Sequence, residues 1–566
     1  MNILHKTLLS CALGGALLAP TLSEASSQSP QERFAQLRDK YVSAIQPLEK
    51  EANEAWWESS TTGSDAAYAR REAAEKAMAK LHQDPQLFAQ LKELRQGQPL
   101  ADPVEARQLE IMYFNFLPYQ ADPQVTHQII ALETEVDKIF NTHRSRVGSK
   151  ELTENEVRQI LSTTSDSAQA QAAWEGYMAV GRKVAPPLKK LVQLRNQMAR
   201  QLGYKDYFLM QLAVQEFEPQ ELLATFEELD RLTLAPFKEL KGEIDAYQRQ
   251  RFQLKEEEPL RPWHLGDLFF QEAPELKTAG INLDDLYEGQ DPVKLSTKYY
   301  HSLNLDPQAI IERSDLYERP GKSPHAFETC IDRQQDIRVL CNVKPNALWM
   351  DTVNHELGHG LYDQHIDPQL PYLLRTPAHI LTTEGLAMLM GEMTRTPDFL
   401  AQVLEVPASK LPPYAQASWK LLRSERLVFS RWTQTMLHFE KEMYANPEQD
   451  LNRLWWDLKK RYQLQEPPTE LSGADYGAKM HVVGAPVYYH NYMLGDLFAA
   501  QIYAHLLEKL KLDPAQHPSL YAQPQAGELL KNQLFAPGNR YPWPELVKRV
   551  TGQELSPKAF AQLFLH

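Results

Sequence analysis

The sequence predicts a mainly α-helical fold, and three observations support this. Apolar residues recur every three or four positions over long segments, which is the period of an amphipathic helix. Only 24 of the 566 residues are glycine, fewer than the turns of a large all-β protein require. Hydrophobic residues make up 43% and charged residues 24% of the chain, a composition typical of globular proteins. We expect one or two small β-hairpins beside the helices.

The spacing of apolar residues places the helices along the chain. The first is expected from Phe34 to Trp56, with Pro47 as an internal kink. The next is expected over 66–94, and turn residues at 96–103 end it. Further helices are predicted around 105–117, 124–142, 153–162, 168–202, 219–254, 382–396, 415–444 and 491–511.

One segment has a different period. Apolar residues occupy alternate positions from Ile337 to Val343, which predicts a short strand. Pro345 ends it, and a helix is expected to begin near Ala347. The loop before this strand and the strand itself carry the two cysteines of the expected mature chain.

The first 25 residues are typical of a cleaved secretory signal peptide. Lys6 precedes a short apolar stretch, and small residues stand before position 26. The stretch is too short to span a membrane. Lipid attachment at Cys11 is disfavoured because most of the apolar run follows that residue. We expect a periplasmic or secreted protein whose mature part, 26–566, has no integral membrane segment.

Charge and cysteine content narrow the function further. The net charge is -14, which argues against a broad surface for nucleic acid or an anionic membrane. Cys330 and Cys341 remain after removal of the signal peptide. Because an exported protein folds in oxidising surroundings, we expect them to form a disulfide, with two unpaired thiols as the alternative.

The predicted helix after Ala347 carries an H-E-x-x-H motif. His355 and His359 are four positions apart, so they share one helix face and can reach one metal ion. Zn²⁺ binds such nitrogen ligands and keeps one position open for water in catalytic sites. Glu356, beside the first ligand, is expected to take a proton from that water.

Two residues compete for the place of third ligand. Glu384 lies among small and apolar residues of a second predicted helix, where a carboxylate needs a metal or a cationic partner. His365 follows His355 by ten positions, as in sites where a glycine turns the chain after the helix. Tyr362 occupies the place of that glycine, so Glu384 is favoured and His365 remains the alternative.

Short segments around this motif resemble the angiotensin-converting enzyme family, the peptidyl-dipeptidase A metallopeptidases, in a bacterial-type secreted form. Each is weak alone, but they follow the family's order along nearly the whole mature chain. They are Glu51–Trp56, Leu265–Gln271, His325-Ala326, Trp455-Trp456, Gly477–His481 and Tyr489–Tyr492.

The resemblance implies a fold and a set of substrate-binding residues. The fold would be a two-lobed helical ellipsoid with a deep central cleft, forming a single metallopeptidase domain of two subdomains with an N-terminal helical lid at about 30–95. The substrate's C-terminal carboxylate would bind Gln271, Lys479 and Tyr489. His325 and His481 would bind substrate carbonyls, Ala326 would line the cleft through its backbone, and Tyr492 would stabilise the oxyanion.

The chain departs from the family's pattern at several positions. Met388 stands where the family has an Asp that supports a zinc histidine, and Asp351 is a candidate replacement. A shorter segment before Pro486 leaves Tyr488 as an alternative to Tyr489. Asn491 and Lys459 replace two arginines that serve chloride, so chloride dependence is left open.

The expected function is zinc-dependent release of C-terminal dipeptides from oligopeptides, with one Zn²⁺ per chain. The alternatives are a related zinc oligopeptidase or metallocarboxypeptidase, and a non-catalytic peptide-binding homologue. We expect a monomer or a weak dimer.

Overall fold

The computed structural model describes residues 28–274, 281–470 and 473–564. The predicted signal peptide, 1–25, lies outside the described residues. Helices dominate, and the strands form two antiparallel pairs, so the mainly α prediction with small hairpins is confirmed. Within the described ranges, no helix is both long and apolar enough to cross a membrane.

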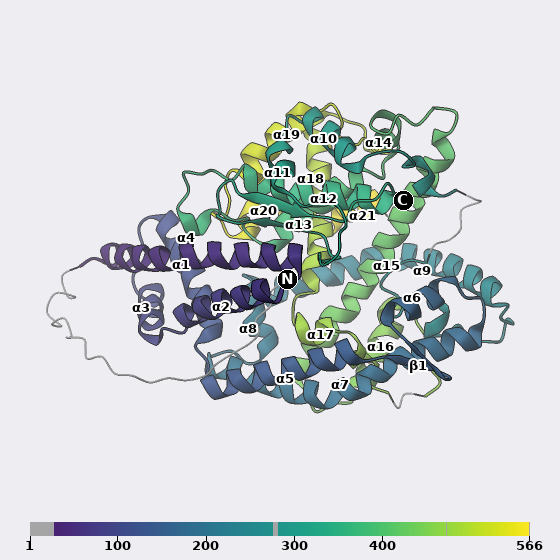
Figure 1. Ribbon diagram of the computed structural model, residues 1–566, viewed down its shortest axis with the longest axis horizontal. Helices are drawn as coiled ribbons and strands as arrows, with labels where there is room; N and C mark the ends of the chain where they lie inside the picture. Colours follow the sequence, from purple (N-terminus) through teal and green to yellow (C-terminus); the bar gives the residue numbers. More distant parts are fainter. Residues whose placement is uncertain (1–27, 275–280, 471–472, 565–566) are drawn as a thin grey trace.

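The N-terminal helices form a layer of their own (Figure 1). They are α1 (Pro30–Thr62), α2 (Asp65–His82), α3 (Pro85–Gln96) and α4 (Pro103–Phe116). Residues such as Phe34, Ile45, Leu91 and Met112 build an apolar cluster separate from the main core. Near the end of α1, Trp56 stacks on Phe327 with ring centroids 4.4 Å apart.

The helix predicted over 66–94 is two helices in the structure. The Asp84 carboxylate accepts hydrogen bonds from the N–H groups of Gln86 (2.9 Å) and Leu87 (3.1 Å) and so caps α3. Pro85 has no N–H and begins the new helix. Pro47, in contrast, lies inside α1 without ending it.

The remaining elements form a lower and an upper half in Figure 1. The lower half holds α5 (Pro123–Thr142), β1 (Ser145–Val147), β2 (Lys150–Leu152), α6 (Glu154–Thr163), α7 (Ser167–Gln201), α8 (Tyr207–Val214), α9 (Pro219–Phe252), α16 (Leu451–Gln463) and α17 (His481–Gly484). The upper half holds α10 (Pro292–Ser302), α11 (Gln308–Arg313), α12 (Ala347–Gln364), α13 (Ile380–Met393), α14 (Pro397–Gln402), α18 (His490–Leu510), α19 (Pro524–Leu529), α20 (Trp543–Thr551) and α21 (Lys558–Phe564).

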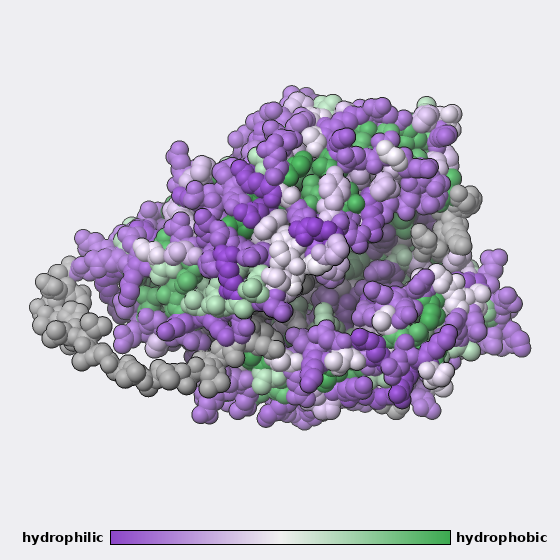
Figure 2. Space-filling view, viewed as in Figure 1, coloured by the Kyte–Doolittle hydropathy of each residue, from purple (hydrophilic) through white to green (hydrophobic). Residues whose placement is uncertain are grey.

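The long helix α15 (Leu411–Ala445) runs from the upper into the lower half. The space-filling surface is hollowed between the halves (Figure 2). One apolar core continues through both halves. The expected domain and lid boundaries stay a prediction.

Close packing of α13 on α18 determines where Glu384 lies. A Cβ added at Gly385 would come within 2.8 Å of Phe498 Cδ1 and 3.0 Å of the Gly495 carbonyl oxygen. Glycine at this position therefore lets the two helices approach. Glu384, one residue earlier, is held between α12 and α18.

The expected disulfide is wrong. Strand β3 (Phe327–Cys330) pairs with β4 (Ile337–Leu340), and the register places Cys330 opposite Ile337. Cys341 lies four residues further along, about 13 Å away at roughly 3.3 Å per residue. A disulfide needs Cα atoms within about 7 Å, so the hairpin keeps these thiols apart.

Candidate functional site

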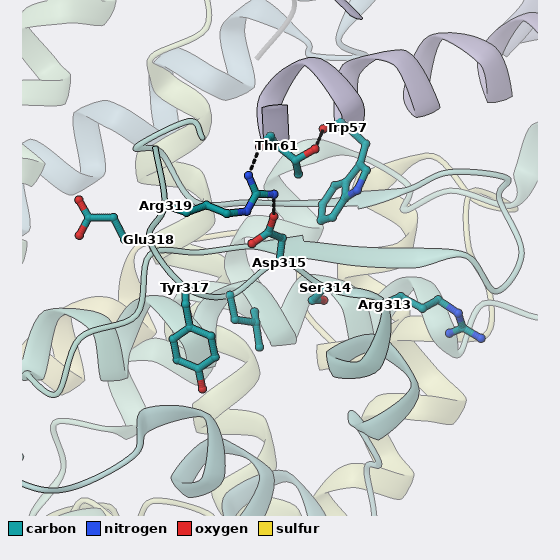
Figure 3. A pocket seen from close by; sticks show the side chains of 9 residues that line it. Trp57, Thr61, Arg313, Ser314, Asp315, Tyr317, Glu318 and Arg319 are labelled. Carbon is teal, nitrogen blue, oxygen red and sulfur yellow. Dashed lines mark hydrogen bonds and ion pairs between the residues drawn. The ribbon is translucent and has the colours of Figure 1, made fainter. Parts of the chain in front are cut away.

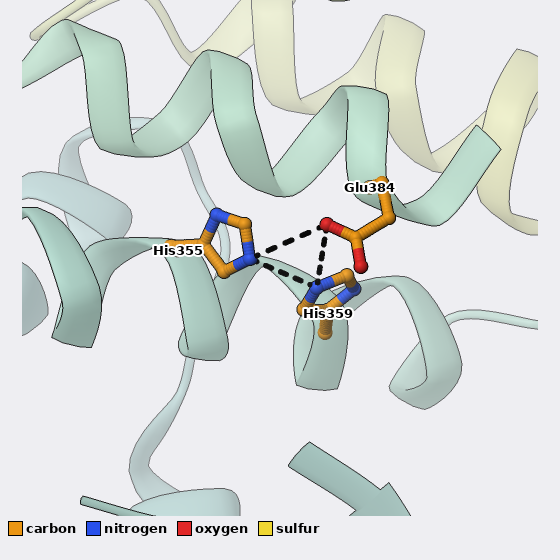
Figure 4. Close-up of side chains that lie close together, drawn as sticks. All are labelled: His355, His359 and Glu384. Carbon is orange, nitrogen blue, oxygen red and sulfur yellow. Dashed lines mark hydrogen bonds and ion pairs between the residues drawn. The ribbon is translucent and has the colours of Figure 1, made fainter. Parts of the chain in front are cut away.

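Two histidines and a carboxylate converge between α12 and α13 (Figure 4). His355 Nε2 lies 3.1 Å from His359 Nε2. Glu384 Oε2 lies 3.6 Å from His355 Nε2 and 3.9 Å from His359 Nε2. In the described part of the chain this trio is the group whose donor atoms could hold a metal ion.

The trio fits a tetrahedral zinc site. Zinc–nitrogen and zinc–oxygen bonds are about 2.0–2.2 Å long, so tetrahedral ligand atoms lie about 3.3–3.6 Å apart. The three measured separations bracket that range. Burial lowers the pKa of His359 well below its usual value, so its imidazole is neutral and can act as a ligand.

His359 is oriented by a residue that the sequence did not reveal. Thr383 Oγ1 lies 2.6 Å from His359 Nδ1. Nε2 faces the other two members of the trio, so Nδ1 carries the proton. The Nδ1–H group donates a hydrogen bond to the Thr383 hydroxyl oxygen. Thr383 directly precedes Glu384 in the sequence. This adjacency to a predicted ligand was the one feature of the sequence that could have pointed to it.

The alternative third ligand lies elsewhere. His365 ends α12, and its Nδ1 bonds the Leu361 carbonyl oxygen at 2.9 Å. Its ring packs near Phe535, with centroids 6.0 Å apart. The structure therefore places Glu384, and not His365, beside the two histidines.

A buried carboxylate does lie near the trio, but it is not Asp351. Asp351 pairs with Arg395 at 3.3 Å. Asp496, on α18, is 2% exposed and pairs with Arg426 at 2.9 Å. Burial raises the pKa of Asp496 to about 6. The charge of Glu384 also raises this pKa, while His355 lowers it. Asp496 thus supplies a negative charge close to the trio, whereas Met388, at the position where the family has an Asp, supplies none.

Glu356 is 8% exposed, next to His355 on α12. Burial, with a smaller contribution from the charge of Glu384, raises its pKa to about 7, while His355 and a hydrogen bond from the Glu328 backbone oppose the shift. A carboxyl group in this range can both accept and return a proton near neutral pH.

The predicted carboxylate-binding residues meet in the lower half. Lys479 Nζ donates to Gln271 Oε1 at 2.5 Å. The same ammonium lies 5.3 Å from the ring centroid of Tyr489 and 5.2 Å from that of Phe269. Lys479 is 5% exposed, and in the described ranges no carboxylate lies within ion-pair distance of it.

Burial lowers the pKa of Lys479 to about 8. Other charged groups act on it more weakly. They are Asp267, Arg158, Glu272 and Glu154, and Lys479 in turn acts on Lys459 and His481.

Aromatic contacts run from this lysine through Tyr489 to Tyr492. Tyr489 packs against His481 and against Tyr492, each with centroids 5.2 Å apart. Burial, with a smaller contribution from the charge of Glu384, raises the pKa of Tyr492, so its hydroxyl stays protonated. Tyr488, the alternative, packs on Tyr492. The ring that lies beside the Lys479 ammonium is that of Tyr489. Burial lowers the pKa of His481 to about 4, so its ring is neutral.

The two remaining predicted residues lie at the start of the β3 hairpin. His325 is exposed, and its N–H donates to Ser323 Oγ at 3.3 Å. Ala326 packs against the main core. Neither residue has a hydrogen bond or ring contact, within the described chain, with the trio or with Lys479.

The positions tied to chloride have protein partners. Lys459 Nζ donates to the Phe269 carbonyl oxygen (2.7 Å) and to Gln463 Oε1 (2.9 Å). Asn491 Nδ2 donates to Gln215 Oε1 at 2.7 Å. Burial lowers the pKa of Lys459 to about 7. The chloride question stays open.

A hollow of about 500 Å³ lies apart from these residues (Figure 3). It is bounded by Trp57 and Thr61 of α1 and by the segment 313–319. Arg319 crosses it to bond Asp315 and the Thr61 backbone. None of the predicted site residues lines it.

The chain resembles known proteins along most of its length. A family model described as angiotensin-converting enzyme matches residues 28–264 and 268–565. Angiotensin-converting enzyme from Sus scrofa is 23% identical over 435 residues, which cover 71% of this chain and 32% of that protein. Angiotensin-converting enzyme-like protein Ace3 from Mus musculus is 24% identical over 449 residues, covering 73% of this chain and 59% of that protein.

The chain thus spans about a third of the length of the angiotensin-converting enzymes it matches. The family model, in contrast, covers nearly all the described residues, including the metal trio and Lys479. The chain belongs to the angiotensin-converting enzyme family of peptidases.

Proposed function

We propose that this metallopeptidase is zinc-dependent and releases dipeptides from the C-termini of oligopeptides. His355, His359 and Glu384 would hold the ion, because their separations and their N, N, O donor set suit zinc. A bound zinc ion polarises a carbonyl group and makes water more acidic.

One observation carries the dipeptide specificity: Lys479 is a buried ammonium without a carboxylate partner among the described residues. Burying a charge is costly unless it is paired. The free carboxylate of a peptide would supply that pair, and Gln271 would donate a second, neutral hydrogen bond. A carboxylate anchored at this position would fix how many residues lie between it and the metal trio.

The other residues have roles that follow from their positions. Glu356 takes a proton from the attacking water and gives it to the leaving amine. The Tyr492 hydroxyl donates to the oxyanion of the tetrahedral intermediate. Neutral His481 binds a substrate carbonyl, and the Tyr489 hydroxyl reaches the anchored carboxylate.

Product analysis tests this function. An N-terminally blocked pentapeptide with a free C-terminus is incubated with enzyme, and the products are identified by mass spectrometry with and without a chelator. We expect a chelator-sensitive C-terminal dipeptide, and little cleavage of the same peptide with a C-terminal amide. Release of single amino acids would instead support a carboxypeptidase, and internal cuts an oligopeptidase.

Lys479→Met separates the anchor from the chemistry. This variant should lose about 10- to 100-fold in kcat/KM on the free acid, because a charge-assisted hydrogen bond contributes about 1.5–3 kcal/mol. It should lose much less on the amide. A zinc-loaded protein that cleaves no peptide of a broad panel would favour a non-catalytic binding protein.

We also propose that the protein is exported, on the basis of the N-terminal segment in the sequence. N-terminal sequencing of protein from the periplasm or medium would test this, and a mature chain that still begins at Met1 would contradict it.

A further inference from the structure

Side chains, and not other main-chain groups, hold the segment 268–271 in place. The segment belongs to no helix or strand, and within the described ranges none of its main-chain groups bonds another main-chain group. Phe270 has a left-handed backbone, with φ at 53°, and its side chain is fully buried. A bulky residue rarely adopts this conformation, because its Cβ crowds the backbone. Such strain persists only where surrounding groups determine the conformation, and it is found mostly at functional sites.

Two side chains of α16 bind the carbonyl oxygens of the peptide groups that flank the Phe270 Cα. Lys459 Nζ donates to the Phe269 oxygen at 2.7 Å, and Gln463 Nε2 donates to the Phe270 oxygen at 2.6 Å. The two side chains, four positions apart on one helix face, also bond each other, Nζ to Oε1 at 2.9 Å. Both are buried. The peptide groups before and after the strained residue are thus fixed from one helix.

The rest of the segment is held in the same manner. Oδ2 of the Asp267 carboxylate accepts from the N–H groups of Phe269 (3.2 Å) and Gln271 (2.8 Å). Trp174 Nε1 donates to the Leu268 carbonyl oxygen at 3.0 Å. Three consecutive carbonyl oxygens and two N–H groups are therefore bound by side chains, so the segment is ordered before any ligand binds.

Lys459 has no assigned role that explains its burial. Its Nζ lies 5.0 Å, 5.5 Å and 5.8 Å from the ring centroids of Trp432, Trp455 and Trp456. Within the described chain no carboxylate lies at ion-pair distance from it, so its polar contacts are the hydrogen bonds to the segment and to its own helix. Burial lowers the pKa of Lys459 to about 7, and the neutral amine and the ammonium can both donate these two bonds. The contact with the segment therefore does not depend on charge.

The residue after the strained position belongs to the proposed carboxylate anchor, which consists of Lys479 and Gln271. Gln271 Oε1 accepts from Lys479 Nζ at 2.5 Å. The backbone angles of Phe270 set the direction of the chain at Gln271. A change to an ordinary negative φ would therefore turn the Gln271 side chain away from Lys479.

We propose that Lys459 and Gln463 are positioning residues for the carboxylate anchor. They keep the segment 268–271 in the conformation that brings the Gln271 amide to Lys479, so that both can meet the terminal carboxylate together. The inference rests on the proposed function, because the segment has this role only if Gln271 and Lys479 bind that carboxylate. Neither Lys459 nor Gln463 touches the substrate, and each acts through the main chain just before Gln271.

Two N-terminally blocked pentapeptides, identical except for a free acid or an amide at the C-terminus, test the inference. The readout is the acid preference, defined as kcat/KM for the acid divided by kcat/KM for the amide. Lys459→Met and Gln463→Leu should each lower the acid preference by about 3- to 10-fold, the contribution of one neutral hydrogen bond. The change should appear in KM of the free acid, with kcat nearly unchanged, because the reacting groups are untouched.

A Gln271→Leu background separates positioning from other effects. Because Gln271 transmits the effect, neither substitution should lower the acid preference further in that background. Gln463→Leu changes no charge, so an electrostatic effect on the carboxylate cannot produce its result. Lys322→Met is the matched control, because Lys322, with a side chain that is 0% exposed, also bonds main-chain carbonyl oxygens, those of Asp315 and Tyr317 at 2.8 Å. It should keep the acid preference of the wild type.

The outcomes are distinguishable. Circular dichroism and the melting temperature show whether each variant is folded, and Gln463→Leu carries the test if Lys459→Met is not. An acid preference that Gln463→Leu does not change overturns the inference. A drop in Lys459→Met that recurs in full in the Gln271→Leu background also overturns it, because the charge of Lys459 then acts on the carboxylate directly. A wild-type enzyme that shows no acid preference, or releases no dipeptide, rejects the proposed function itself.

Discussion

The hydrogen bond between His359 and Thr383 can be tested by replacing Thr383 with valine, which removes the hydroxyl and keeps the shape. In the structure the two atoms are 2.6 Å apart, and Thr383 is 9% exposed. Without the hydroxyl, the Nδ1–H of His359 loses its buried acceptor, which costs about 1–3 kcal/mol.

Only part of this cost reduces zinc affinity, because the bond also exists before zinc binds. The part that affects zinc affinity is the free energy with which the hydrogen bond holds the His359 ring in the tautomer and orientation that a ligand requires. Changes at such supporting partners weaken metal binding by about 10- to 100-fold. We therefore expect the zinc Kd of Thr383→Val to rise by that factor, while the rest of the cost appears as a lower melting temperature of the zinc-free protein.

The assay is competition with a chromogenic zinc chelator at fixed pH. Thr352→Val is the matched control, because the Thr352 hydroxyl bonds the Leu348 carbonyl oxygen on the same helix as the histidines. An unchanged Kd for Thr383→Val, or an equal rise for Thr352→Val, would refute the reasoning.

Three further predictions concern catalysis, pH and packing. Glu356→Gln should keep its zinc, measured by atomic absorption, and lose about 10²–10⁴-fold in kcat, because proton transfer is removed and no ligand is; loss of zinc would contradict the assigned role. Because the Lys479 ammonium is protonated below its pKa of about 8 and neutral above it, KM for free-acid peptides should rise about tenfold per pH unit above that value, a limb that amidated peptides should lack. Gly385→Ala should destabilise the fold by about 1–3 kcal/mol in urea unfolding, because its Cβ has no room between α13 and α18. Gly242→Ala, in an open position on a helix, should instead be neutral or stabilising by up to about 1 kcal/mol, and equal effects at the two glycines would contradict the packing argument.

Helical periodicity predicted most of the architecture because each helix buries one face against a common core. Even the start of α12 at Ala347 follows from the sequence, since Asn346 caps it by accepting from the Trp349 N–H at 2.9 Å. The division at Pro85 was missed because the residues on both sides keep the same apolar period. A local cap, and not the pattern, decides that boundary.

The metal trio was predictable in part for a local reason: two of its members are four residues apart on one helix. Thr383 was not, because its place beside His359 depends on how α12 and α13 pack. The disulfide was wrong because cysteine spacing along a hairpin carries no information about register. Cys330 and Cys341 are eleven residues apart in sequence, yet the turn lies nearer to Cys330, so they do not face each other.

The trio, on α12 and α13, and the buried lysine, just before α17, belong to opposite halves of the molecule. A peptide whose C-terminal carboxylate binds Lys479 while its reacting bond lies at the trio would contact both halves at once. The length of the fragment removed is then a property of the whole scaffold and of no single loop. Some substitutions far from the reacting atoms would change the orientation of one half relative to the other. Small changes of this kind should first make the enzyme release fragments of mixed length, and larger changes should abolish cleavage.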